Sequence, residues 1–420
     1  MKLNDMQKKV VYSNERFLFL LAGAGSGKTR VVIERIKYLL NEGVDENEIL
    51  ALTFTNKAAN EMKHRIGRDD MNIHTFHQFC YKELKTKTEY TYQIFIEEEH
   101  QFSKRDCLEV SLYKNSLFKK KKPKIYDFYQ NYLERYHLKD FDDLLIDYLN
   151  WIQIKKHKTY TYLFVDEFQD TNELQYNILK ALIDEHTHVL CVGDPDQSIY
   201  QFRGANPSII NKYVKDYQAV VEKLTINYRS NSTIISHANR LIKRNYRTYK
   251  KDLTPYHTHT NHVTSYIFMN PEEESNFIIS YIKKMISQGI KPDEIAVLYR
   301  QHHRCYKLIE TLKTIDFSYY QEKSSTQHKS NIHLLSIHQA KGLEFDVVII
   351  LGLESNIFPS AHTYQNVLLE EERRLMFVAI TRAKEHLICT HIKYNDYFQR
   401  QKPSLFIKES GLKSKLYKPI

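Results

Sequence analysis

Cysteine is scarce in this sequence, and its copies are scattered. The 420 residues include five cysteines, and no two of them form a C-x-x-C pair. This spacing argues against a disulfide-stabilised scaffold, a zinc ribbon or an iron–sulfur site. We therefore expect a protein of the reducing cytoplasm.

Long apolar runs are also missing. The run FLFLLA at residues 17–22 is far shorter than the roughly 20 residues that a membrane-spanning helix needs. The polar start MKLNDMQKKV lacks the apolar core and cleavage pattern of a signal peptide. We expect no membrane partner and no export.

Tryptophan occurs once, whereas the other aromatic residues are abundant, with 31 Tyr and 21 Phe. Lys and Arg number 61 against 51 Asp and Glu, which gives a formal net charge of +10. Positive charge attracts a polyanion, and aromatic rings offer stacking surfaces for unpaired bases. Single-stranded nucleic acid fits both features.

Short apolar runs recur along the chain. Each has the length of a strand and is apolar on both faces, as in strands buried in a parallel sheet, and helical text such as TRVVIERIKYLL (29–40) lies between them. We predict an α/β fold with two sheets, and the length favours two or three domains. The seven runs are FLFLLA (17–22), ILALTF (49–54), YLFVDE (162–167), HVLCVGD (188–194), IAVLYR (295–300), HLLSIH (333–338) and DVVIILGL (346–353).

A phosphate-binding loop follows the first of these strands. The text AGAGSGKTR (22–30) matches G-x-x-x-x-G-K-[ST] except that Ala22 replaces the first glycine. Lys28 would neutralise the β- and γ-phosphates, and the Thr29 hydroxyl would bind Mg²⁺. The residues that we expect to contact ATP here are Ala22, Gly23, Ala24, Gly25, Ser26, Gly27, Lys28 and Thr29.

Two adjacent carboxylates end a second apolar strand in YLFVDEFQD. Asp166 would hold Mg²⁺, and Glu167 would orient and deprotonate the attacking water. An acidic pair at a strand end is otherwise a turn or a helix cap, and the phosphate loop favours the catalytic interpretation.

Further motifs lie in order between residues 3 and 409. They are LNDMQKKVV (3–11), AGAGSGKT (22–29), ALTFTNKAANEM (51–62), IHTFHQF (73–79), VDEFQDTNELQ (165–175), VGDPDQSIYQFRGA (192–205), LTINYRS (224–230), SIHQAKGLEFDVV (336–348), EEERRLMFVAITRAKEHL (370–387) and PSLFIKE (403–409). Through these motifs and their order, the chain resembles the UvrD/Rep/PcrA family of superfamily-one DNA helicases.

The resemblance implies further ATP-site residues. Arg229 and Arg382 match the two arginines that reach the γ-phosphate, and Gln197 matches its sensor. Gln7 would read the adenine, with Tyr228 stacking on it unless Tyr228 is a core residue. Glu344 would approach the ribose or phosphate, and Arg30 would flank the nucleotide.

The resemblance also implies a track for single-stranded DNA. Phe202 stands where the family usually has Trp, and Gln78 where Ser is common, so base stacking should persist at the weaker end of its range. For the two phenylalanines a packed core, and for the two histidines a structural role, are the alternatives. The track residues are Phe54, Asn56, His77, Tyr200, Phe202, Arg203 and His338.

The same resemblance implies two RecA-like lobes. Residues 1–80 and 160–222 would form the ATP-binding first lobe, interrupted by a helical subdomain at 81–159. Its run KKKKPK is a solvated loop or a DNA contact. Residues 223–420 would form the second lobe, in which a short linker near 313–332 replaces the family's accessory domain.

We expect an ATP- and Mg²⁺-dependent helicase and translocase that moves 3′→5′ on single-stranded and 3′-tailed duplex DNA. The rival is an ATP-gated module that loads DNA for a nuclease or a replication or repair protein; RNA is an alternative track. Strand separation would use a wedge at Tyr394, Tyr397 and Phe398 unless these are ordinary surface aromatics. The stretch YHTHTNH reads as a loop rather than a metal site, and no nuclease activity is expected. The sequence leaves the pathway open.

Overall fold

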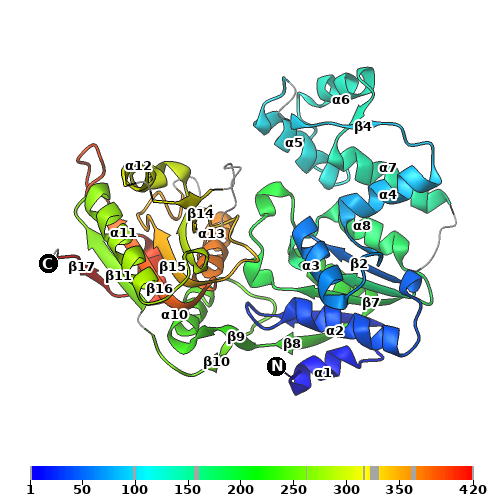
Figure 1. Cartoon of the computed structure of the whole chain (residues 1–420). Coiled ribbons are helices and arrows are strands. Elements are labelled where there is room, and N and C mark those ends of the chain that lie inside the picture. Colours follow the sequence, from blue (N-terminus) through cyan, green and yellow to red (C-terminus); the bar gives the residue numbers. More distant parts are fainter. Residues whose placement is uncertain are drawn as a thin grey trace. The chain divides into compact units, whose positions relative to one another are not determined.

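The chain folds into two compact units in the computed structural model (Figure 1). The structure describes residues 2–97, 101–155, 160–261, 263–315, 317–321, 331–360 and 366–418. Unit 1 consists of Met1–Ala22 and Gly27–Leu224, and unit 2 of Gly23–Ser26 and Thr225–Ile420. Each unit contains a parallel sheet with helices, which confirms the predicted α/β class with two RecA-like lobes.

The six-stranded sheet of unit 1 has the order β3-β2-β6-β7-β1-β8, and its paired strands are parallel. Its strands are buried on both faces because helices cover both. Leu18 and Leu20 belong to the core beneath α2, whereas Phe19 faces Phe168 on the other side. The elements of this lobe are α1 (Asp5–Val11), β1 (Phe17–Ala22), α2 (Lys28–Asn41), β2 (Ile49–Thr53), α3 (Asn56–Ile66), β3 (Ile73–Thr75), β6 (Tyr162–Val165), α8 (Glu173–Leu182), β7 (His188–Gly193), α9 (Ser208–Tyr217) and β8 (Val220–Leu224).

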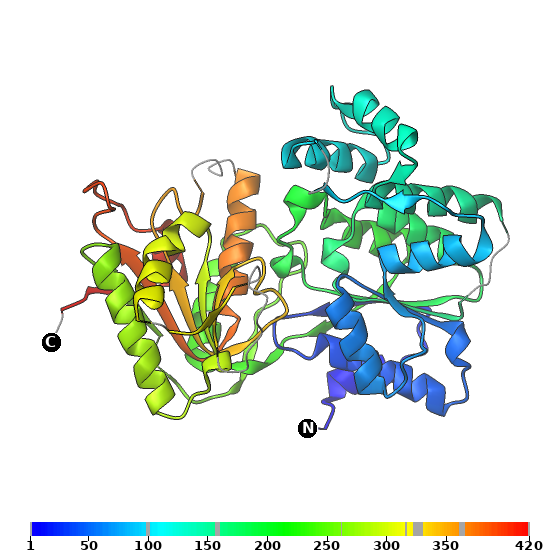
Figure 2. The same ribbon diagram turned by 45° about the horizontal axis from the view of Figure 1, so that its top comes forward.

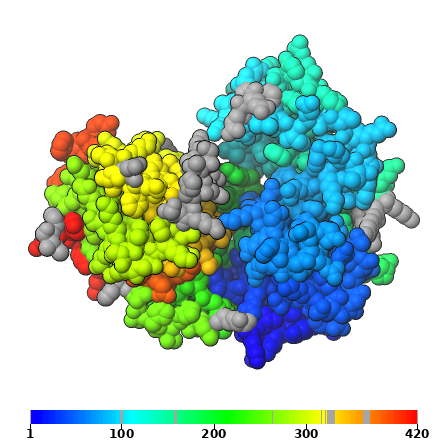
Figure 3. Space-filling view, viewed as in Figure 1, coloured from blue at the N-terminus to red at the C-terminus, as the bar shows by residue number. Residues whose placement is uncertain are grey.

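A helical insertion interrupts this lobe between β3 and β6. Its small core combines Phe95, Val110, Tyr129 and Leu133. In the space-filling view its cyan surface adjoins the blue surface of the preceding residues (Figure 3). The elements between β3 and β6 are α4 (Phe76–Lys87), β4 (Gln93–Ile94), α5 (Lys104–Asn115), α6 (Tyr126–Arg135), β5 (Leu138–Lys139) and α7 (Phe141–Ile154).

Unit 2 has a seven-stranded sheet with the order β13-β14-β12-β15-β16-β11-β17, again parallel throughout its pairs. One face packs on α11 and α12, while α10 and α13 cover the other; Figure 2 shows α11 (yellow-green) and α13 (orange) on opposite sides of the strands. The elements are β9 (Ile226–Asn231), α10 (Ser232–Ile242), β10 (Thr254–His257), β11 (Val263–Phe268), α11 (Pro271–Ser287), β12 (Ile295–Tyr299), α12 (Tyr306–Thr314), β13 (Tyr319–Tyr320), β14 (Ile332–Ser336), β15 (Phe345–Leu351), α13 (Asn366–Ile380), β16 (Ala383–Ile392), α14 (Leu405–Ser410) and β17 (Ser414–Leu416).

All five cysteines are buried and unbridged. Burial raises the pKa of Cys305 and of Cys389 to about 12. Within the described residues, none of the helices combines the length and apolarity that crossing a bilayer requires. Half of the linker predicted near 313–332, namely residue 316 and residues 322–330, lies outside the described residues.

Candidate nucleotide and DNA-binding sites

The chain turns sharply between β1 and α2. Gly25 and Gly27 have φ angles of +63° and +83°, which L side chains rarely adopt. A Cβ on Gly25 would also lie 2.6 Å from Asn227 Nδ2 and 2.8 Å from Arg229 Cβ. The loop therefore requires glycine at this position, and it delivers the chain into the N-terminus of α2, where free N–H groups favour anions.

Hydrogen bonds from Asn227 and Tyr228 hold the backbone carbonyls in the middle of this loop. Asn227 Nδ2 donates to the Ala24 carbonyl at 2.7 Å, and the Tyr228 N–H donates to the Gly25 carbonyl at 2.9 Å. The Ser26 hydroxyl donates to the Gly23 carbonyl at 2.7 Å. The bonds from Asn227 and Tyr228 use loop carbonyls as acceptors, and the Ser26 N–H also donates to the Gly23 carbonyl, at 3.2 Å, so the loop shape is held by bonds to its own carbonyl oxygens.

The first turn of α2 meets the end of β6. Lys28 Nζ lies 3.2 Å from Glu167 Oε1, and the Thr29 hydroxyl donates to Asp166 Oδ2 at 3.2 Å. The structure thus brings together the lysine, the hydroxyl and both carboxylates that the sequence nominated. Lys28 and Glu167 form an ion pair, and Thr29 and Asp166 share a hydrogen bond. We expect a Mg²⁺–triphosphate to bind among these four groups.

Asp166 and Glu167 have different surroundings although they are adjacent. Burial and, next, the charge of Glu167 raise the pKa of Asp166 to about 6. Glu167 has a φ of +53°, a left-handed backbone that is uncommon outside glycine and occurs at functional sites. The two carboxylates have different partners in α2, since Asp166 accepts from Thr29 and Glu167 pairs with Lys28. Thr29 Oγ1 and Asp166 Oδ2 are hard oxygen ligands, so these residues fit Mg²⁺.

Gln197 and Gln7 are buried near this site in unit 1. Gln197 Nε2 donates to Asp194 Oδ2 at 2.6 Å in the turn after β7. Gln7 Oε1 accepts from the Asn4 N–H at 3.0 Å, and this bond caps α1. If Gly27 carried a Cβ, that atom would lie 3.0 Å from Gln7 Nε2. The Gln7 amide therefore lies beside the phosphate loop. Arg30 follows in the first turn of α2 and is half-buried.

Unit 2 holds the two nominated arginines in hydrogen bonds of its own. Arg229 Nε donates to Glu344 Oε2 at 2.7 Å, and Arg229 Nη1 to the Thr381 carbonyl at 3.1 Å. Arg382, only 2% exposed, donates through Nη1 to the Leu343 carbonyl at 3.0 Å. Burial acts to raise the pKa of Glu344, but the charge of Arg229 holds it below its ordinary value. The three predicted residues thus form one cluster.

Tyr228 precedes this cluster on β9. Its ring lies 4.9 Å from that of Tyr256, at an interplanar angle of 40°. Both rings are outside the buried core: Tyr228 is half-buried and Tyr256 is exposed. The two rings are tilted against each other, and each offers an aromatic face of the kind on which a base can stack.

Four of the predicted DNA-track residues form an aromatic cluster in unit 1. Phe54 stacks on Tyr200 with ring centroids 5.2 Å apart and planes within 22°. Tyr200 lies 6.3 Å from Phe202, and the Arg203 guanidinium lies 5.4 Å from the Phe202 centroid. Phe202 is 44% exposed, so its ring is available for stacking on a base.

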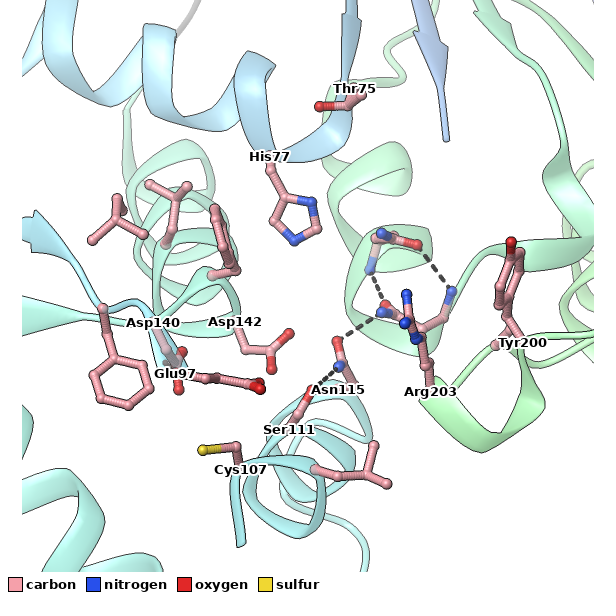
Figure 4. A pocket seen from close by; sticks show the side chains of 18 of the residues that line it. Thr75, His77, Glu97, Cys107, Ser111, Asn115, Asp140, Asp142, Tyr200 and Arg203 are labelled. Carbon is pink, nitrogen blue, oxygen red and sulfur yellow. Dashed lines mark hydrogen bonds between the residues drawn. The ribbon is translucent and has the colours of Figure 1, made fainter. Parts of the chain in front are cut away.

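A cavity of about 1170 Å³ adjoins this cluster between the first lobe and the insertion. Figure 4 shows His77 and Asp142 directed into it. Burial lowers the pKa of His77 to about 4, so its imidazole is neutral, and burial and then Asp140 raise the pKa of Asp142 to about 7. The charged groups that line the cavity are Glu97, Lys104, Asp140, Asp142, Asp170 and Arg203.

This lining contains four acids and two bases, in a chain with a net positive charge. Such an acidic lining repels phosphates, whereas its aromatic rings and neutral polar groups such as Asn56 suit bases. We therefore expect the cavity to suit bases better than phosphates.

Two family models match the chain. One describes the UvrD/REP helicase N-terminal domain and matches residues 3–106 and 91–218; the other describes the UvrD-like helicase C-terminal domain and matches residues 222–321 and 315–394. The chain belongs to the UvrD-like DNA helicase family.

Relatives in this helicase family differ in length. A probable DNA helicase of Mycoplasma pneumoniae is 32% identical over an alignment of 466 positions, gaps included. This alignment covers 97% of this chain and 86% of the relative. The ATP-dependent DNA helicase PcrA of Staphylococcus aureus is 33% identical over 370 residues, covering 76% of this chain and 50% of PcrA. DNA helicase II of Haemophilus influenzae is 34% identical, covering 74% of this chain and 50% of its own. The match thus extends over most of one relative and half of the other two.

Two histidines of the stretch YHTHTNH have partners within the protein, and His338 lies in unit 2. His338, a track residue by family resemblance, is half-buried just after β14 in unit 2. In the stretch YHTHTNH, His257 Nε2 lies 3.1 Å from the Tyr228 carbonyl and His259 Nε2 lies 2.8 Å from Glu385 Oε2. His262 lies outside the described residues. The described residues contain no group of three or more His, Cys, Asp or Glu suited to a metal.

Sequence reasoning missed three polar residues that organise these helicase motifs. Asn227 bonds the phosphate loop, Asp194 bonds Gln197, and Gln169 bonds Glu167. Each lies inside a motif quoted above, one to three residues from a nominated side chain. The signal in the sequence was an amide or carboxylate side chain within a motif, close to a nominated residue. When such a polar group is buried, it must be hydrogen-bonded to a neighbour.

Proposed function

We propose that this helicase-family chain is an ATP- and Mg²⁺-dependent translocase and helicase that moves 3′→5′ along single-stranded DNA. One observation carries the proposal: unit 1 joins Lys28, Thr29, Asp166 and Glu167 through contacts of 3.2 Å. These are the groups that phosphoryl transfer to water requires in a P-loop enzyme. A cytoplasmic location stays a prediction from the composition.

In the proposed reaction Lys28 leaves Glu167 and pairs with the β- and γ-phosphates. Thr29 and Asp166 would hold Mg²⁺, which supplies charge neutralisation at the phosphates. Glu167 would then orient and deprotonate the attacking water. Arg229 and Arg382 exchange their bonds to Glu344 and to backbone carbonyls for bonds to the γ-phosphate, where they stabilise the transition state.

Strand separation is assigned to the turn after β16. Tyr394 pairs with Arg400 as an antiparallel bridge, and the tip between them exposes Tyr397 and Phe398 by 83% and 89%. Side chains so exposed contribute little to the core. Their rings suit the role of a wedge that stacks on the last base pair of a duplex.

A second candidate is an ATP-gated module that loads DNA for a partner nuclease, replication or repair protein. The short segment of 20 residues from Lys313 to Ile332, where larger family members have an accessory domain, favours it. Unwinding costs about 1.4 kcal/mol per base-pair step, and a chain without that domain has less surface with which to hold the duplex.

A paired assay on the wild-type chain separates the candidates. ATP turnover is measured with and without single-stranded DNA, beside strand displacement on 3′-tailed and 5′-tailed duplexes. We expect turnover to rise at least tenfold with DNA and displacement on the 3′-tailed substrate. Turnover without displacement supports the loading module, and displacement of the 5′-tailed substrate alone contradicts the proposed polarity.

A further inference from the structure

Gln169 is fully buried between the hydrolytic carboxylate and the loop that follows β7. Its Nε2 donates to Glu167 Oε2 at 2.5 Å and to Asp170 Oδ2 at 3.3 Å. Its Oε1 accepts from the Asp194 N–H at 2.8 Å. One amide therefore spans two segments that are 27 residues apart in the sequence.

The orientation of this amide is fixed by its partners. A backbone N–H can only donate, so the Gln169 oxygen must face Asp194, and the NH₂ group then faces the Glu167 carboxylate. A rotation by 180° would set donor against donor and oxygen against carboxylate. Because the amide cannot flip, a displacement of Asp194 should shift Glu167, and a displacement of Glu167 should shift Asp194.

The neighbours of Gln169 leave it little room. A Cβ on Gly193 would lie 2.8 Å from Gln169 Oε1, and the Ser198 hydroxyl donates to the Gln169 carbonyl at 3.2 Å. The side chain is 0% exposed. Movement of the loop after β7 must therefore move the amide, since close-packed surroundings transmit small shifts.

The same loop carries the aromatic cluster. It makes two short helical turns, at Pro195–Gln197 and Gln201–Arg203, and its backbone bonds close around Tyr200. From Asp194, which Gln169 holds, to Phe202, which stacks at the surface, the chain advances only eight residues. A base that displaces the Tyr200 or Phe202 ring acts on a segment tied directly to Glu167.

We propose that Gln169 is a positioning residue that couples DNA occupancy of Tyr200 and Phe202 to the placement of the Glu167 carboxylate. This inference rests on the proposed DNA-stimulated ATPase. It assigns to one amide the step by which binding of a base increases hydrolysis. Gln169 itself touches neither DNA nor ATP in this role.

The test compares Gln169→Met with Gln169→Glu in the full chain. Met removes all three hydrogen bonds of the amide at similar volume, whereas Glu retains the acceptor for the Asp194 N–H and loses the donor to Glu167. We expect both variants to lose at least tenfold in kcat at saturating single-stranded DNA, and the ratio of turnover with and without DNA to fall below two. KM for ATP and the affinity for a fluorescent oligo-dT should stay within about threefold.

Gln130→Met is the matched control, because the Gln130 amide also bonds a carboxylate, Asp143 at 3.4 Å, but lies in the insertion. It should retain full DNA stimulation. The inference is overturned if either folded Gln169 variant keeps the wild-type ratio, if KM and DNA affinity collapse together with kcat, or if neither variant folds. An absence of stimulation in the wild-type chain would instead overturn the proposed function.

Discussion

The two parallel sheets use their edges differently. In unit 1 Lys28, Asp166 and Asp194 come after the carboxyl ends of β1, β6 and β7, and Phe54 and His77 follow β2 and β3 at that same edge. In unit 2 Glu344 and Arg382 precede β15 and β16 at the amino edge, whereas His338 follows β14 at the carboxyl edge. The residues nominated for ATP and for DNA thus share one edge in unit 1 and lie at opposite edges in unit 2.

This difference sets how each unit can couple its two sets of residues. In unit 1 a single side chain, Gln169, spans the distance from Glu167 to the loop that carries Tyr200. In unit 2 the edges are separated by the length of a strand such as β15, about 3.3 Å per residue over seven residues. Coupling in unit 1 therefore needs only local hydrogen bonds, while in unit 2 it must pass along the sheet.

The largest effect is expected from Lys28→Ala, which removes the cation of the shared edge. Turnover should fall by about 10³-fold or more, roughly 4 kcal/mol, because the phosphates lose their charge partner. Binding of single-stranded DNA, measured by fluorescence anisotropy, should stay within a few fold, since Lys28 lies outside the aromatic cluster. Surviving turnover would contradict the ATP site.

Arg229→Lys tests the amino edge of unit 2. Lysine keeps the charge but cannot reproduce the fork that bonds Glu344 and the Thr381 carbonyl, so kcat should fall by about 10²–10³-fold. Arg300→Lys is the control, because Arg300 makes a similar fork to Glu372 in the same unit but is not an ATP-site residue, and this variant should change kcat far less. Equal losses in the two variants would show that Arg229 acts structurally.

Phe202→Ala sharpens the comparison at the DNA end of unit 1. Loss of one stacking ring should weaken oligo-dT binding by about 1–3 kcal/mol, and basal turnover should change little. DNA titrations of turnover measure both. Since Phe202 is 44% exposed, the melting temperature should hold. Equal loss of basal and stimulated turnover would place Phe202 in the core.

Asp142→Asn should give the smallest effect, on stability. The native carboxyl has a pKa of about 7 against 3.8 as its ordinary value, so between about pH 4 and pH 7 the unfolded chain binds fewer protons and stability falls as the pH rises. Asn does not titrate, so the variant does not lose stability in this way. Its free energy of unfolding should exceed that of wild type by about 1–2 kcal/mol at pH 8 and equal it near pH 4.

Urea unfolding at the two pH values measures the difference. The nearby charged groups Lys114, Asp140 and Asp143 are present in both proteins. A wild-type chain that gains stability from pH 4 to pH 8 relative to the variant would contradict the assignment.

Much of the fold followed from hydrophobic runs. All seven runs form strands, because strands buried on both faces leave an unbroken apolar signature. The sequence analysis missed β11, whose text VTSYIF mixes polar and apolar residues, and β8 (VVEKL), which is half-buried at a sheet edge. Partial burial weakens the pattern by which a strand is recognised.

The candidate site was predictable as a set of residue types but not as a geometry. Motif order nominated Lys28 and Glu167, and the structure places them in contact. The left-handed backbone of Glu167 and the bridging role of Gln169 depend on distant packing, at Gly193 and Asp194, that no local spacing encodes. Residues whose role is to satisfy other residues become visible only in three dimensions.

The burial of every native thiol gives a practical advantage for following this chain at work. Alkylating reagents react with exposed thiolates, and these five sulfurs are enclosed and reluctant to ionise. A cysteine introduced at an exposed position of each unit would therefore accept a fluorophore with little background, without prior removal of native residues. The distance between two such dyes could then be recorded through successive rounds of nucleotide turnover.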